Sequence, residues 1–134
     1  MDLGAEIGRR LRRGDVVALH GPLGAGKTTL VKGIARSLHI QEPVTSPSFT
    51  LIAEYDGIKQ AAAIVLYHVD LYRISHPQEI EDLGIEEILN GGGICVIEWA
   101  EKAAEFLPDS AIHVHITLEE GESRAVEIEG FFER

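Results

Sequence analysis

VVALHGPLGAGKTTLVKGIARSL, residues 16–38, is the stretch that decides the fold. Residues 16–20 are apolar and β-branched and predict a buried strand. Leu30, Ile34 and Leu38 recur every four residues, which predicts a helix over residues 27–38. Between them, residues 21–28 fit the pattern G-x-x-x-x-G-K-[ST] at every position. This pattern between a strand and a helix predicts a phosphate-binding loop, or P-loop.

Each residue type in this loop has a chemical reason. Glycines let backbone N–H groups approach a phosphate with no Cβ in the way, and the free N–H groups and dipole of the following helix favour an anion. Lys27 supplies a positive charge to the β- and γ-phosphates, the Thr28 hydroxyl is an oxygen ligand for Mg²⁺, and Thr29 can reach a nearer phosphate. The alternative is a glycine-rich strand–helix turn without a ligand. The expected nucleotide-binding residues of the loop are Gly21, Pro22, Leu23, Gly24, Ala25, Gly26, Lys27, Thr28 and Thr29.

Two apolar strands end in a carboxylate, which a Mg²⁺ ion beside such a loop requires. IVLYHVD ends at Asp70 and ICVIE ends at Glu98. Ligands of α/β sheets bind at the carboxyl ends of the strands. We therefore expect Glu98 to contact the metal, directly or through water, together with Thr28. Asp70 is expected to be a second metal contact or to orient the attacking water, so Asp70 and Lys27 are the catalytic candidates. Each acid could instead cap its strand in solvent.

A hydroxyl-rich segment, TSPSFT at residues 45–50, follows the helix after the loop. Such a segment can sense the γ-phosphate and Mg²⁺ in phosphoryl-transfer proteins. The alternative is an ordinary turn determined by Pro47.

The remaining periodicities predict an α/β fold with a mixed central sheet, a single three-layer P-loop NTPase-like domain over residues 1–134. Asp56-Gly57 predicts a turn, Ser75 and Gln78 have capping-box spacing, and residues 120–122 predict the tip of a terminal hairpin. We expect helices at residues 2–12, 27–38, 77–89 (broken or kinked near Gly84) and 101–106, and strands at 16–20, 49–55, 64–70, 94–98, 112–117 and 126–129.

Composition and charge restrict the class of protein. The chain has 134 residues, 45% hydrophobic and 25% charged, which excludes a disordered chain. The net charge is −10, yet residues 1–40 hold 7 basic and 3 acidic residues. Affinity for phosphate backbones comes mainly from Lys and Arg, so we expect no DNA binding. One cysteine and no apolar run of transmembrane length lead us to expect a cytoplasmic protein without membrane contact.

Four segments together resemble the bacterial TsaE family, the small ATPase of tRNA threonylcarbamoyladenosine biosynthesis. They are GPLGAGKTTLVKGIARSL at 21–38, VTSPSFTLIAEY at 44–55, LYHVDLYRI at 66–74 and ICVIEWAEKAAEFLP at 94–108. The resemblance covers roughly residues 3–129 in order and spacing. The combination of SP[ST][FY]T, HxDLYR and EW after a P-loop is far more specific than any one of these motifs.

The resemblance implies a P-loop domain that binds ATP or ADP with Mg²⁺ and works with TsaB and TsaD proteins. Those proteins build the modification on adenosine 37 of tRNA, so this chain would contact tRNA indirectly or weakly. By position, Thr28 and Glu98 match the family's metal-binding residues and Asp70 its acid in HxDLYR. Arg124 lies in the hairpin where the family can contact nucleotide. The family usually has an extra segment before the first helix, so the resemblance does not predict the adenine contacts.

Two other functions remain open, a small P-loop kinase and a nucleotide-gated binding module with incidental hydrolysis. A kinase needs a lid with several arginines, and few basic residues follow residue 40. Arg73 could reach phosphate or form a local salt bridge. Trp99 is expected in the core, or packed on the segment at 45–50 or on a partner. His113 and His115 could chelate a metal, but no third ligand is near in sequence.

Overall fold

The structure of the protein is a computed structural model that describes residues 2–22, 26–45, 47, 51–118 and 124–130. Its helical elements are α1 (Leu3–Arg10), α2 (Lys27–Ser37), α3 (Pro77–Asp82), α4 (Ile85–Leu89) and the 3₁₀ helix η1 (Ala100–Phe106). Its strands are β1 (Val16–His20), β2 (Ile52–Lys59), β3 (Ala62–Asp70), β4 (Ile94–Glu98), β5 (Ile112–Leu118) and β6 (Arg124–Glu129).

The strands form one mixed sheet in the order β2-β3-β4-β1-β5-β6. The four inner strands are parallel: β1 pairs with β4 and β5, and β3 pairs with β4. Each edge strand, β2 and β6, is antiparallel to its neighbour. The predicted mixed sheet is confirmed, because the parallel pairs are joined by helical crossovers and the antiparallel pairs are hairpins.

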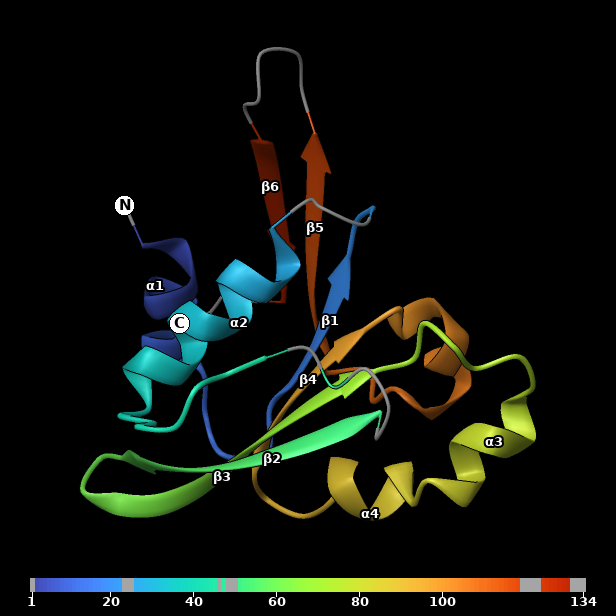
Figure 1. Cartoon of the computed structure of the whole chain (residues 1–134), viewed down its shortest axis with the longest axis horizontal. Coiled ribbons are helices and arrows are strands. Elements are labelled where there is room, and N and C mark those ends of the chain that lie inside the picture. Colours follow the sequence, from blue (N-terminus) through green and yellow to red (C-terminus); the bar gives the residue numbers. More distant parts are fainter. Residues whose placement is uncertain (1, 23–25, 46, 48–50, 119–123, 131–134) are drawn as a thin grey trace.

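Helices cover both faces of this sheet, so the predicted three layers are also confirmed (Figure 1). One face packs against α1 and α2, and the other packs against α3, α4 and η1. The first core lies between the sheet and the helices α1 and α2, and the second lies on the opposite face. Along β1, Val17 and Leu19 face the first core, while Val16 and Ala18 face the second. A strand buried on both faces reads as a continuous apolar run, which is the pattern at residues 16–19.

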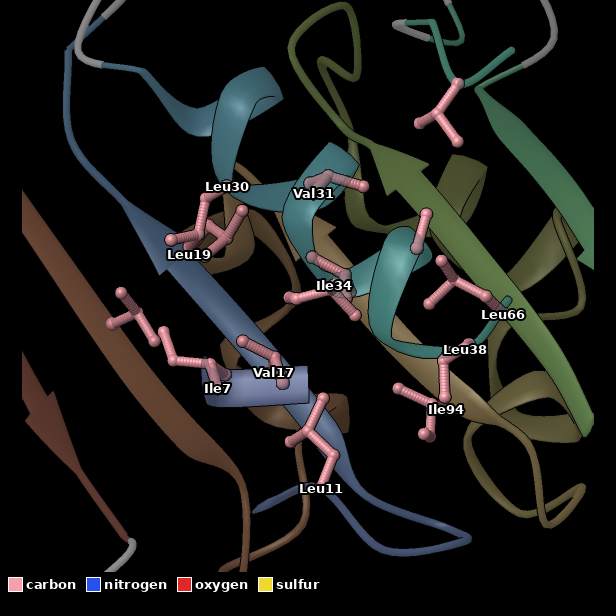
Figure 2. Packing of buried hydrophobic residues seen from close by; sticks show 14 of the residues in the cluster. Ile7, Leu11, Val17, Leu19, Leu30, Val31, Ile34, Leu38, Leu66 and Ile94 are labelled. Carbon is pink, nitrogen blue, oxygen red and sulfur yellow. The ribbon is translucent and has the colours of Figure 1, made fainter. Parts of the chain in front are cut away.

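The first core is built from the helical stripe that the sequence predicted. Leu30, Ile34 and Leu38 of the α2 segment point onto β1, β3 and β4, with Ile7 and Leu11 filling the space beneath (Figure 2). The helices α1 and α2 cross so closely that a Cβ on Gly33 would lie only 2.7 Å from the Cα of Gly4. This packing holds the first turn of α2 against the carboxyl end of β1.

The hairpin of β2 and β3 differs from the prediction. Asp56 and Gly57 lie inside β2, and the turn falls at Gln60 and Ala61, whose φ angles are 52° and 64°. Gly57 is required for a different reason: a Cβ there would lie 2.6 Å from the Leu38 carbonyl oxygen. The glycine therefore permits close approach of the α2 C-terminus rather than a reversal of the chain.

The predicted break in the helical stretch at 77–89 is confirmed at Gly84, which has a φ of 76° and separates α3 from α4. The cap is one residue later than predicted, because the Glu79 carboxylate accepts hydrogen bonds from the backbone N–H groups of Ser75 and His76. The terminal hairpin forms as expected from β5 and β6, with its predicted tip outside the described residues. Among those residues, no helix has both the length and the apolar character to cross a membrane.

Candidate functional site

Three strand ends meet at one edge of the sheet, beside the start of α2. β1 ends at His20, directly before Gly21, while β3 ends at Asp70 and β4 ends at Glu98. Asp70 pairs with Glu98 in the β3–β4 register, and Glu98 pairs with Leu19 in the β4–β1 register. The structure thus brings the start of the predicted phosphate-binding loop and the two acids to one edge of the sheet, as the strand ends predicted.

Two positions in the loop require glycine, one for its backbone conformation and one because a side chain would not fit there. Gly26 adopts a left-handed conformation with a φ of 96° as the N-cap of α2. A Cβ on Gly21 would lie 2.6 Å from the Ile116 carbonyl oxygen of β5. The other loop residues, Leu23, Gly24 and Ala25, lie outside the described residues.

Lys27 is a buried ammonium group at the junction of the loop and β4. Its residue is 5% exposed, and its Nζ donates a hydrogen bond to the Gly21 carbonyl oxygen at 2.9 Å. The same Nζ lies 4.0 Å from Glu98 Oε1 and 4.8 Å from the centre of the Trp99 ring. The carbonyl, carboxylate and aromatic face together compensate for burial of the positive charge.

Glu98 is the second buried charged group, and it has a partner that the sequence did not reveal. His68 of β3 lies 2.6 Å, Nε2 to Oε2, from the Glu98 carboxylate. Among the described residues, the buried polar or charged side chains are Lys27, His68 and Glu98. All three therefore converge at the end of β4, where hydrogen bonds and charge pairing offset the cost of burying them. The available signals were a single histidine within the apolar strand IVLYHVD and its place as the first residue of the HxDLYR motif.

Asp70 is only half-buried and borders an open hollow. Its Oδ1 accepts a hydrogen bond from the Tyr72 N–H at 3.0 Å, and its backbone N–H donates to the Leu51 carbonyl at 2.9 Å. The hollow, about 160 Å³ in volume, is lined by Pro47, Leu51, Asp70, Tyr72 and Arg73. Pro47 of the hydroxyl-rich segment and Leu51, which follows the segment, thus lie beside the same hollow as Asp70. Ser46, Ser48, Phe49 and Thr50 lie outside the described residues.

Trp99 follows Glu98 directly and is partly buried against the second core. Its φ of 60° is a left-handed conformation that a bulky residue rarely adopts, and such a conformation costs about 1–3 kcal/mol. Its ring contacts the Tyr72 ring, with centroids 5.2 Å apart. The ammonium groups of Lys27 in α2 and Lys102 in η1 lie over the Trp99 ring, 4.8 Å and 5.7 Å from its centre. Core packing, the expected role, is therefore only part of its environment.

The remaining predicted nucleotide contacts have weaker placements. Thr28 and Thr29 lie in the first turn of α2. Arg124 begins β6 and pairs through its backbone with Leu118, beyond the level at which β1 ends. The Arg124 side chain lies outside the described part of the chain, so its contact to nucleotide stays a prediction.

His113 and His115 have a third imidazole beside them, on the sheet face opposite to α2. His20 Nε2 and His113 Nδ1 are 3.0 Å apart, and the His20 ring stacks on His115 with centroids 4.5 Å apart. Burial, followed by these neighbouring imidazoles, lowers the pKa of His20. The rings stack nearly parallel. In the described ranges, no group of three or more His, Cys, Asp or Glu side chains could hold a metal.

The mixed sheet, the strand–loop–helix unit and the buried Lys27–Glu98 pair define an α/β protein of the P-loop NTPase-like class. The family model for the threonylcarbamoyl adenosine biosynthesis protein TsaE matches residues 1–126. The chain belongs to the TsaE family and is therefore a protein of tRNA threonylcarbamoyladenosine biosynthesis.

Individual relatives agree with the family model. The tRNA threonylcarbamoyladenosine biosynthesis protein TsaE of Treponema pallidum is 44% identical over 115 residues, which is 86% of this chain and 82% of the relative. The protein of the same name from Nostoc sp. is 44% identical and covers 98% of this chain and 80% of the relative. The crystal structure of Bacillus subtilis YdiB superposes with a TM-score of 0.73 at 36% identity, over 92% of this chain and 73% of that one.

Proposed function

We propose that the protein binds ATP or ADP with Mg²⁺ and hydrolyses ATP. In this proposal, hydrolysis supports threonylcarbamoyl transfer to adenosine 37 of tRNA by acting on a TsaD–TsaB type complex. The observation that carries the proposal is the buried Lys27–Glu98 pair, 4.0 Å apart, where the phosphate-binding loop meets β4. A buried lysine beside a glycine-rich loop and a buried carboxylate is the set of groups that phosphoryl transfer needs.

The residues present fit a bound Mg²⁺ by their chemistry. Mg²⁺ prefers oxygen ligands and is commonly bound through one or two carboxylates together with substrate phosphates. The Thr28 hydroxyl lies at the start of α2 and the Glu98 carboxylate at the end of β4, so these two residues would hold the ion. Bound there, Mg²⁺ would neutralise charge on the transferred phosphoryl group.

The chain's own residues divide the work of hydrolysis. Backbone N–H groups of the loop and of the first turn of α2 (residues 21–29, except Pro22, which has no N–H) bind the phosphates and orient them. Lys27 contributes a fixed positive charge in a water-poor position, where electrostatic stabilisation is strongest. Asp70, beside the hollow that Pro47 and Leu51 line, orients the attacking water or contributes a second metal contact. Arg124 is a further proposed contact to the nucleotide.

The proposed partners account for the distribution of charge. The net charge of −10 disfavours direct tRNA binding, so tRNA contact is indirect or weak. In this proposal, nucleotide binding and hydrolysis by this chain act on protein partners of the TsaD and TsaB types. The only cysteine, Cys95, is buried, and burial raises the pKa of its thiol to about 12. A single cysteine that is free of any disulfide fits the cytoplasmic location that we propose.

A mixing assay tests this function. ATP hydrolysis would be measured for the chain alone, with TsaB and TsaD type proteins, and with a panel of kinase acceptors. We expect slow hydrolysis alone and faster hydrolysis with the two partners, and we expect Lys27→Ala to abolish both. ADP formation that depends on a small acceptor would instead support a kinase. Nucleotide binding with no partner-dependent hydrolysis would support a nucleotide-gated binding module.

A further inference from the structure

His68 has no role in the function proposed above, yet it is one of the most completely buried polar side chains of the sheet. It is 0% exposed and lies on the α2 face of β3, in line with Leu66. Its Nε2 is 2.6 Å from Glu98 Oε2. Its other nitrogen, Nδ1, is buried and has no hydrogen-bond partner within the described part of the chain.

The register of the sheet explains why the imidazole reaches this carboxylate. In the parallel β3–β4 pair, His68 lies opposite Val96, and Asp70 lies opposite Glu98. His68 and Glu98 are therefore diagonal neighbours on one face of the sheet, a spacing that long side chains bridge. The histidine occupies Oε2, whereas Oε1 is the oxygen nearer to Lys27. One oxygen is thereby fixed by the fold and the other is directed toward the loop.

The unpartnered nitrogen determines which ring nitrogen carries the proton. A proton on Nδ1 would leave a buried donor without an acceptor in the described part of the chain, which is energetically unfavourable. With the proton on Nε2, the N–H group donates a hydrogen bond to Glu98 Oε2, and Nδ1 carries only a lone pair. His68 therefore donates to Glu98 through its Nε2–H group.

We propose that His68 is a positioning residue that holds the Glu98 carboxylate in the orientation required for binding a divalent cation. The inference rests on the proposed function, because it assigns a partner to the carboxylate which that function uses. Groups that hydrogen-bond a metal-binding carboxylate orient it, and their loss commonly weakens metal affinity about 10–100-fold. His68 itself touches neither metal nor nucleotide in this scheme.

Two substitutions separate the hydrogen bond from the volume of the ring. In His68→Gln, the amide nitrogen can occupy the position of Nε2 and donate to Glu98. In His68→Asn, the shorter amide reaches only the position of Nδ1. His113→Gln, on the opposite face of the same sheet, is the matched control for loss of a histidine.

The measurement is the affinity for Mn²⁺ of each protein saturated with ADP, followed by the electron paramagnetic resonance signal of free Mn²⁺. We expect His68→Asn to raise the Mn²⁺ dissociation constant about 10–100-fold, and His68→Gln and His113→Gln to stay near the unaltered protein. ADP affinity in EDTA should be the same for all four proteins, because the phosphate-binding loop is unchanged. Equal Mn²⁺ affinity for His68→Asn and the unaltered protein, or equal loss for Gln and Asn, would overturn the proposal.

A second measurement needs no variant and therefore does not depend on folding of the Asn protein. Long-range ¹H–¹⁵N spectra of the unaltered chain report which nitrogen of each histidine is protonated. The proposal requires the Nε2–H form at His68, and an Nδ1–H form would contradict it. Failure of the unaltered chain to bind ADP at all would contradict the proposed function, and the inference with it, and is distinguishable from either result.

Discussion

Lys27 and Glu98 are charged side chains held within the fold rather than on its surface. Removing one member of a buried pair leaves the other without compensation, which is strongly unfavourable. Here His68 supplies a further hydrogen bond to Glu98, and Gly21 supplies one to Lys27. At the scale of single residues, the candidate site is thus a small network in which each charge has at least two compensating contacts.

Glu98→Ala should separate binding of the nucleotide from binding of the metal. We expect the variant to retain ADP binding, because the loop and Lys27 remain, and to lose the Mg²⁺ dependence of that binding. Calorimetric titration of ADP with Mg²⁺ and with EDTA measures both. Glu105→Ala, an exposed acid on η1, is the control and should keep its Mg²⁺ dependence. Partner-stimulated hydrolysis that survives Glu98→Ala would show that the metal role is wrong.

The histidine cluster of His20, His113 and His115 should make stability depend on pH. Because burial and the adjacent imidazoles lower the pKa of His20 below its ordinary value of 6.5, the unfolded chain binds this proton more readily than the folded one. The free energy of unfolding therefore falls as pH drops through 6.5, and the effect is absent at higher pH, where both states are neutral. Glu101 of η1 faces the same ring and opposes part of this effect.

Urea denaturation from about pH 7.5 to about pH 5.5 measures this dependence. His20→Gln should show a smaller loss of stability over this range than the unaltered protein. His39→Asn is the control, since His39 is exposed and its left-handed backbone suits Asn. Hydrogen bonds lower the pKa of Asp2 (chiefly from Arg36) and of Glu79 (from the His76 backbone, then that of Ser75), so both carboxylates titrate below this window. An unchanged slope in His20→Gln would contradict the assignment.

The α1–α2 crossing is the feature of greatest consequence at the scale of elements. Gly4 and Gly33 allow the two helices to approach at backbone distance, and a Cβ on Gly33 would lie 2.7 Å from the Gly4 Cα and 2.8 Å from the Ala5 nitrogen. The contacting atoms belong to the backbone and cannot rotate away. This crossing sets the position of α2, and hence of the loop, over the end of β1.

Gly33→Ala tests the crossing by the sign of its effect. Helix propensity alone predicts that alanine stabilises the interior of α2 by about 1 kcal/mol. The steric clash predicts the opposite, a loss of about 1–3 kcal/mol in the free energy of unfolding, and we expect the loss to prevail. Chemical denaturation measures the difference, with the exposed neighbour Lys32→Ala as a control expected to stay near zero. A stabilised Gly33→Ala protein would show that the helices do not pack this closely.

At the scale of the whole molecule, the net charge is −10, and contacts within the fold engage part of the basic charge. The basic residues at 9–13 lie at the end of α1 and beyond, and Arg13 donates hydrogen bonds to carbonyl oxygens of Lys59, Ala62 and Ala63 at the β2–β3 hairpin. Arg36 forms an ion pair with Asp2. Part of the positive charge of the N-terminal third is thus engaged within the fold.

Weak tRNA binding by the chain alone is the corresponding prediction. At roughly physiological salt, we expect filter-binding or gel-shift assays to show little retention of tRNA by the chain. Retention should appear when TsaD and TsaB type proteins are added, because affinity for a phosphate backbone depends on the number of Lys and Arg contacts. Tight, salt-sensitive binding by the isolated chain would contradict indirect contact. The TsaD and TsaB type proteins without this chain provide the control.

Local sequence patterns predicted much of the fold and part of the site. The apolar run at 16–20, the four-residue stripe to Leu38 and the loop motif between them depend on neighbours in the chain. The predicted strand and helix formed as β1 and α2. The strand-end positions of Asp70 and Glu98 followed in the same way, because a parallel sheet aligns the carboxyl ends of its strands. Their chemical roles stay proposals.

The sequence by itself therefore determined the strand–loop–helix unit and the acids at the sheet edge, since both arise from short-range periodicity and strand direction. Only the tertiary structure decided that His68 contacts Glu98, that His20 joins His113 and His115, and that Gly57 accommodates the end of α2 instead of forming a turn. Each of these contacts joins residues that are distant in the chain. Their partners depend on strand register and helix packing, which no local pattern specifies.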